Sequence, residues 1–290
     1  MKIVNFIFIK NRSFIQMGRK NIFEILAEKE DIAYQLDRIE TLLSERSIDG
    51  WTLEEFVDEY CIRDWKYRGR CTSCREIRER LCVTFGEVKK NIEDINVVLN
   101  YLEYISNLIW LCNEEYIDNI GEFYDAEYQY LQENVIGLVE DLGYEIKVLD
   151  EEQRVLIVEK NPAVTAVSEI VPIKLSNKVI EYNHFRLKGE LEEKRKILLS
   201  LADKFEPLRK QLKNVNPNLE SNTGFLLNKM NIRHNNKEGK NASEYVANLA
   251  DEELEKWYDE TYQMLLLAML EVDNIERNRM VNELKKIIEG

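Results

Sequence analysis

The sequence predicts a mainly α-helical protein, with long antiparallel helices in bundle-like packing and one β-hairpin between two helical halves. All four prolines lie between residues 162 and 217, so helix-breaking residues of this type are absent from the segments on either side. Apolar residues in those segments recur every three or four positions, which is the period of a helix with one buried face. The content of 44% hydrophobic and 32% charged residues is typical of a folded chain.

The first predicted helix spans residues 22–43, where apolar side chains keep the helical period. Thr52 and Glu55 have the spacing of a capping box, in which each side chain bonds a backbone amide of the other residue. This pair predicts the start of a short helix, TLEEFVDEY.

A second capping-box pattern, Ser73 with Glu76, predicts the longest helix of the first half. Along this helix a seam of apolar residues runs through residues 85–109, and such a seam packs against a partner helix inside the chain or across a dimer. A tyrosine-rich helix is predicted over residues 117–142, and Gly143 is well placed to end it.

The segment YEIKVLDEEQRVLIVEK predicts the single hairpin, because apolar residues alternate on both sides of a polar tetrad. We therefore expect an N-terminal helical region at 1–143, a hairpin at 144–160 and a C-terminal helical region at 161–290. In the last region one helix is expected over residues 175–213 with a break at Pro207. A loop over 214–222 and a short helix over 225–232 follow.

The last predicted helix extends from about Asp251 to Ile288 and has an apolar stripe along one face. Its longest apolar run, like the one near the N-terminus, falls short of the roughly 20 residues that cross a membrane, so no membrane partner is expected. No cleavage site follows MKIVNFIFIK, which argues against a signal peptide, and Met17 is an alternative start. Five cysteines, an odd number, indicate a reducing and therefore cytoplasmic location.

The net charge of −14 comes from one segment. Residues 87–152 hold 17 acidic and 3 basic residues, so the rest of the chain is neutral. Such a segment is either a solvated helix face or a surface that repels nucleic acid or imitates its phosphates.

Cysteines cluster in the first half, where Cys71 and Cys74 form a C-x-x-C with Cys61 and Cys82 nearby. Four thiolates can hold a structural zinc ion, and the alternative is that these are buried or incidental thiols. We expect no cofactor and no metal site. The sequence contains no P-loop, dinucleotide-binding glycine pattern, G-x-S-x-G or H-E-x-x-H.

The stretch RDWKYRGRCTSCREIRER, residues 63–80, has seven basic and three acidic residues with two aromatic residues among them. Basic groups attract phosphates, and aromatic rings stack on unpaired bases. Trp65, Arg68 and Arg70 are therefore candidate substrate-binding residues. The alternative is an ordinary charged connector whose aromatic side chains fold inward.

The stretch NKMNIRHNNKEG, residues 228–239, carries the candidate catalytic pair, Arg233 and His234. A histidine can take the proton from a 2′-hydroxyl, and an arginine can stabilise the charge that develops on phosphate oxygens. The candidate substrate-binding amides around the pair belong to Asn228, Asn231, Asn235 and Asn236. The alternative is a helix end that runs into a turn, because asparagine favours both.

These features resemble the HEPN group of prokaryotic helical-bundle proteins. The resemblance covers residues 175–288 and rests on NKMNIRHNN and the flanking helices, although Arg233 stands directly before His234, whereas that group separates the two residues. It implies a defence or toxin-type protein, often dimeric, that binds RNA and in many members cleaves it without a metal ion. Tyr182 and His184 would support the site from the preceding helix.

Two functions therefore follow from the sequence. The first is RNA binding with metal-independent ribonuclease activity at Arg233 and His234, with RNA or a homodimer as partner. The second is a non-catalytic interaction protein that binds a protein partner through its acidic surface and helical seam.

Overall fold

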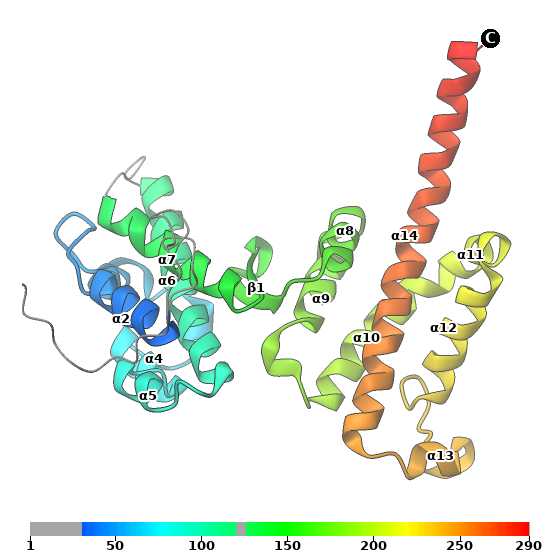
Figure 1. Ribbon diagram of the computed structural model, residues 1–290, viewed down its shortest axis with the longest axis horizontal. Coiled ribbons are helices and arrows are strands. Elements are labelled where there is room, and N and C mark those ends of the chain that lie inside the picture. The colour runs from blue at the N-terminus through cyan, green and yellow to red at the C-terminus, as the bar shows by residue number, and fades with distance from the viewer. Residues whose placement is uncertain (1–30, 120–125, 290) are drawn as a thin grey trace, which may run out of the picture.

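The computed structural model describes residues 31–119 and 126–289, and this part of the chain is mainly α-helical with one two-stranded antiparallel sheet. The N-terminal helices gather at one end of the molecule and the C-terminal helices at the other, with the hairpin between them (Figure 1). The predicted fold class is confirmed.

The N-terminal half begins with α2 (Ile32–Leu43), whose first turn is capped by the Asp31 carboxylate. The predicted extension of this helix back to residue 22 lies outside the described residues. The Thr52–Glu55 capping box is confirmed, because each side chain bonds the other residue's backbone amide. The helices that follow in this half are α3 (Leu53–Phe56), a π-helical turn (Val57–Cys61), a 3₁₀ turn (Lys66–Arg68), α4 (Cys74–Leu81), α5 (Phe85–Lys90), α6 (Ile95–Asn119) and α7 (Ala126–Asp141).

The prediction of one long helix after Ser73 is wrong, because three helices occupy this segment. Ser73 caps α4 as expected, but α4 ends at Cys82, which has a left-handed backbone with φ of 55°. Thr84 and Glu87 then form a capping box of their own and open α5. A left-handed residue followed by a new cap stops one helix and starts the next.

The predicted seam packs inside the chain. Val88, Leu99 and Leu102 are fully buried in the N-terminal core, together with apolar residues of α2 and α7. The predicted start of the tyrosine-rich helix at residue 117 is wrong, because residues 117–119 are the end of α6, and α7 is described from Ala126. Its predicted end is confirmed by Gly143, which has φ of 89°.

The hairpin pairs β1 (Tyr144–Leu149) with β2 (Arg154–Glu159), as predicted, and Ile146 faces Ile157. Successive side chains of a strand point to opposite faces. Accordingly, Ile157 belongs to the N-terminal core, whereas Leu156 and Val158 belong to the C-terminal core. The hairpin is therefore a structural part of both halves.

The C-terminal half packs its helices around the first half of α14. Its elements are α8 (Pro162–Ile170), α9 (Ile173–Tyr182), a 3₁₀ turn (Phe185–Leu187), α10 (Leu191–Phe205), a 3₁₀ turn (Glu206–Leu208), α11 (Arg209–Val215), α12 (Pro217–Lys229), a 3₁₀ turn (Gly239–Asn241), α13 (Glu244–Ala247) and α14 (Asp251–Glu289). The predicted last helix is confirmed, and its C-terminal part projects beyond the other helices (Figure 1).

Two predictions in this half are wrong. The helix expected over residues 175–213 is interrupted between α9 and α10, where Gly189 has φ of 83°, as well as at the predicted break near Pro207. The loop expected over residues 214–222 is the start of α12, because the Asn216 side chain accepts a hydrogen bond from Leu219 N and Pro217 occupies the first helical position.

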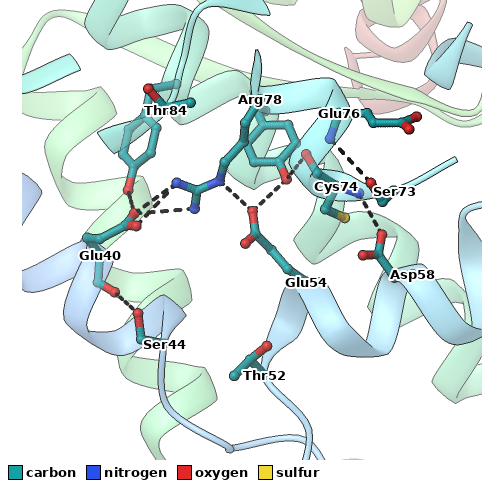
Figure 2. A network of polar contacts seen from close by, with 12 residues as sticks. Glu40, Ser44, Thr52, Glu54, Asp58, Ser73, Cys74, Glu76, Arg78 and Thr84 are labelled. Carbon is teal, nitrogen blue, oxygen red and sulfur yellow. Dashed lines mark hydrogen bonds and ion pairs between the residues drawn. The ribbon is translucent and has the colours of Figure 1, made fainter. Parts of the chain in front are cut away.

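A buried polar network joins the helices of the N-terminal half (Figure 2). Arg78 on α4 donates from Nε to Glu54 of α3 at 2.5 Å and from Nη1 to Glu40 of α2 at 3.2 Å. Tyr101 and Tyr104 of α6 donate to the same two carboxylates at 2.5 and 2.6 Å. Burial lowers the pKa of Arg78, but the two carboxylates outweigh it and raise the pKa above its usual value. Arg78 therefore stays charged.

No helix in the described ranges combines the length and the apolar character needed to span a membrane.

Candidate functional site

The predicted catalytic pair lies in the turn between α12 and α13. The Arg233 side chain, only 19% exposed, forms an ion pair with Glu206 and donates from Nη2 to the carbonyl of Ala202 at 3.3 Å. The ring of His234 is exposed and has no hydrogen bond or ion pair to any residue that the structure describes. The contacts of Arg233 therefore hold this turn against α10.

The asparagines of this turn bond to one another and to backbone groups. Asn231 has φ of 56°, and its side-chain oxygen accepts from Asn236 N while Asn236 Oδ1 accepts from Asn231 N, both at 3.0 Å. Asn236 is buried and also donates to the carbonyl of Asn241. Asn235 Oδ1 accepts from the backbone amides two and three residues further on, and Asn228 is half-buried on α12. Three of the four amides thus shape the turn.

We expect Arg233→Ala to lower the free energy of unfolding by about 1–2 kcal/mol, because it removes charge-assisted hydrogen bonds from a half-exposed pair. His234→Ala, which removes a solvated ring, is expected to stay within about 0.5 kcal/mol of wild type. Urea unfolding followed by circular dichroism measures both. An Arg233→Ala variant with unchanged stability would contradict the structural role that its contacts indicate.

The four cysteines considered as zinc ligands differ in their exposure to solvent. Cys61, Cys71 and Cys74 are buried, whereas Cys82 is exposed. Cys61 donates to the carbonyl of Leu111, and burial raises the pKa of this thiol to about 12. Across residues 31–119 and 126–289, no three His, Cys, Asp or Glu side chains are arranged to hold a metal ion.

The arginine pocket, a cavity of about 340 Å³ beside the hairpin, gathers four arginines: Arg68, Arg80, Arg154 and Arg186. They come from the segment before α4, from α4 itself, from β2 and from the 3₁₀ turn after α9. The apolar lining of the pocket consists of Cys71, Ile77, Leu81, Val155 and Leu156. Residues distant in sequence therefore converge on one cavity.

Three of these arginines form no ion pair with a carboxylate of residues 31–119 or 126–289. Arg154 pairs with Glu152 and Glu181. By contrast, Arg68 donates to the backbone carbonyls of Arg63 and Cys71, and Arg186 donates to the side-chain oxygen of Asn100 at 2.5 Å. Arg80 has no hydrogen bond or ion pair within the described part of the chain. Three guanidinium groups therefore line the pocket without a direct ion pair to any described carboxylate.

Three aromatic residues also line the pocket, and one of them, Tyr104, donates its hydroxyl to Glu54. Trp65 is 7% exposed, and its indole nitrogen is the one buried side-chain nitrogen or oxygen without a hydrogen-bond partner among the residues described. The ring of Tyr67 is 49% exposed and lies under the guanidinium of Arg154, 5.7 Å from the ring centre. A buried N–H without an acceptor is costly, so it indicates a site where an acceptor can bind.

The backbone at Gly69 leaves room for the side chain of Arg80. Gly69 ends the 3₁₀ turn with φ of 64°, a conformation that favours glycine. A Cβ atom added there would lie 3.3 Å from Nη1 of Arg80, which is a tight approach. The wall opposite is α6, where Asn100, Glu103 and Asn107 recur at spacings of three and four and share one helix face.

Glu103, the one carboxylate that lines the pocket, is already engaged. Its Oε2 lies 2.7 Å from Nε2 of His184 and accepts from Ile157 N at 2.8 Å. His184 thus contacts α6, and Tyr182 donates to Asp259 of α14. Among the described residues, neither side chain forms a hydrogen bond with the turn that carries Arg233, and a supporting role there stays a prediction.

Comparison of the chain with models of protein families, with curated proteins and with solved structures finds no match.

The pocket contains part of the basic stretch predicted to bind substrate. Trp65 and Arg68 line it, whereas Arg70 is exposed outside its lining. No residue of the turn that carries Arg233 and His234 lines the pocket. Sequence reasoning missed Arg154 and Arg186 as site residues, because single arginines in a strand and in a short turn carry no local signal.

Proposed function

We propose that this protein binds RNA through the arginine pocket. The observation that carries the proposal is the convergence on one cavity of Arg68, Arg80 and Arg186, none of which pairs with a carboxylate in the part of the chain that the structure describes. Guanidinium groups are the donors that best match phosphate oxygens. Guanidinium groups that have no ion pair within the described protein can form ion pairs with the phosphate groups of a bound ligand.

The aromatic residues favour a nucleotide over a simple anion. The exposed ring of Tyr67 offers a face on which an unpaired base can stack, and the N–H of Trp65 offers a hydrogen bond. Membership of the HEPN group, a role in phage defence and cleavage at Arg233 and His234 stay predictions from the sequence, because the pocket does not include that turn.

Removal of two pocket arginines tests the proposal. We expect Arg80→Ala with Arg186→Ala to weaken binding of a labelled single-stranded 12-nucleotide RNA at least about 10-fold, since a charge-assisted hydrogen bond contributes about 1.5–3 kcal/mol. Fluorescence anisotropy with EDTA present and at two salt concentrations measures the dissociation constants.

The matched control is Arg75→Ala, because Arg75 also lies on α4 but is exposed and pairs with Glu79 outside the pocket. This variant changes the net charge without touching the cavity. The double variant removes two charges and the control one, so a control loss of about half the double variant's loss in binding free energy, or more, would show that RNA is held by general charge attraction, and the proposal would be abandoned.

A further inference from the structure

The arginine pocket is shaped for one nucleotide. Its volume of about 340 Å³ lies near the lower end of the range for small-molecule sites. Its positive charges surround one cavity, whereas proteins that bind along a single-stranded nucleic acid spread their basic groups along a groove. This geometry fits the end of an RNA strand better than its internal nucleotides.

The number of guanidinium groups without an ion pair indicates which chemical group at the end of an RNA strand fits the pocket. An internal phosphodiester carries one negative charge, and a 5′-triphosphate carries at least three. Arg68, Arg80 and Arg186 supply three guanidinium groups that form no ion pair with a carboxylate among the residues described. We propose, resting on the RNA-binding function above, that this pocket recognises the 5′-triphosphate of an RNA strand.

The charge of the rest of the protein supports the same ligand. The chain carries a net charge of −14, and residues 87–152, which include α6 and α7, supply all of it. A polyanion lying across this surface is repelled, whereas a terminal triphosphate meets the local positive field of the pocket. Binding by the end places the most highly charged part of the RNA among the three arginines.

The remaining lining groups suit a terminal nucleotide. Trp65 Nε1 and the side-chain amide of Asn100 are donors for phosphate or ribose oxygens, and Tyr67 is exposed for stacking on the first base. Arg154, already paired with Glu152 and Glu181, supports the ring of Tyr67. The first nucleotide can therefore be held at both its phosphates and its base.

The test uses one RNA sequence with three different 5′ ends. A 12-nucleotide strand labelled at its 3′ end is prepared with a 5′-hydroxyl, a 5′-monophosphate or a 5′-triphosphate, and binding to the full chain is measured by anisotropy with EDTA present. We expect the triphosphate strand to bind at least tenfold more tightly than the hydroxyl strand. Arg80→Ala with Arg186→Ala is expected to abolish this preference.

A milder variant separates recognition from folding. Trp65→Phe keeps an aromatic ring but removes the five-membered ring of a buried indole together with its unpartnered N–H, so the melting temperature is expected to fall slightly while the protein stays folded at the assay temperature. Its affinity for the triphosphate strand is expected to fall severalfold, while its affinity for the hydroxyl strand stays the same. Arg75→Ala, outside the pocket, is expected to retain the full preference.

Three outcomes would overturn part of the proposal. Equal binding of the three RNAs, lost in the double variant, would overturn recognition of the 5′ end and leave RNA binding intact. Binding of free nucleoside triphosphates as tight as that of the triphosphate strand would assign the site to mononucleotides and overturn the RNA end as ligand. No binding of any RNA would overturn the proposed function as well.

Discussion

Arg78→Ala is expected to lower the free energy of unfolding by about 3 kcal/mol, near the lower end of the range for breaking a buried ion pair. The substitution leaves the carboxylates of Glu40 and Glu54 without their shared cation, and each is mostly shielded from water. Tyr101 and Tyr104 keep their bonds to these carboxylates but cannot neutralise them. The loss loosens the packing of α2, α3 and α4 on α6.

Urea unfolding followed by circular dichroism at 222 nm measures this effect. Arg75→Ala is the control, because Arg75 lies on the same helix in an exposed i,i+4 pair whose removal costs about 0.3–0.5 kcal/mol. A triple variant, Arg78→Met with Glu40→Gln and Glu54→Gln, is expected to recover part of the stability, since no unpaired charge remains. An Arg78→Ala protein as stable as the control would refute the account.

Ile157→Ala is expected to cost about 2–5 kcal/mol, the range for truncating a fully buried isoleucine. Its side chain fills the N-terminal core, whereas its neighbours in β2, Leu156 and Val158, fill the C-terminal core. A cavity at this position therefore weakens the attachment of the hairpin to α6. Because Leu156 also lines the arginine pocket, RNA affinity is expected to fall together with stability.

Val148→Ala is the matched control for this prediction, because Val148 lies in β1 of the same hairpin with its side chain half exposed. We expect its cost to stay below about 1 kcal/mol. Chemical unfolding gives the two free energies, and anisotropy with the triphosphate RNA gives the affinities. Similar losses of stability in both variants would contradict the inference that Ile157 attaches the hairpin to the N-terminal core.

The sequence alone predicted the fold class, the hairpin and the last helix, because local signals determine these features. The alternation in residues 144–159 matches the period of a strand, and the apolar stripe after residue 251 matches that of a helix. Capping residues such as Thr52 and Ser73 also fix helix starts locally, since their side chains bond amides within one turn. The left-handed backbone at Cys82 has no such signal, and the seam was therefore read as one helix.

The site depended on tertiary structure, because its residues come from four segments that only packing brings together. The basic stretch 63–80 was recognisable by composition, and Trp65 and Arg68 do line the pocket. Arg154 and Arg186 join it because β2 and the turn after α9 lie against α6, a contact that no sequence period encodes. Local periodicity decides which face of a helix is buried, but long-range packing decides which charges meet and which of them are left without a partner.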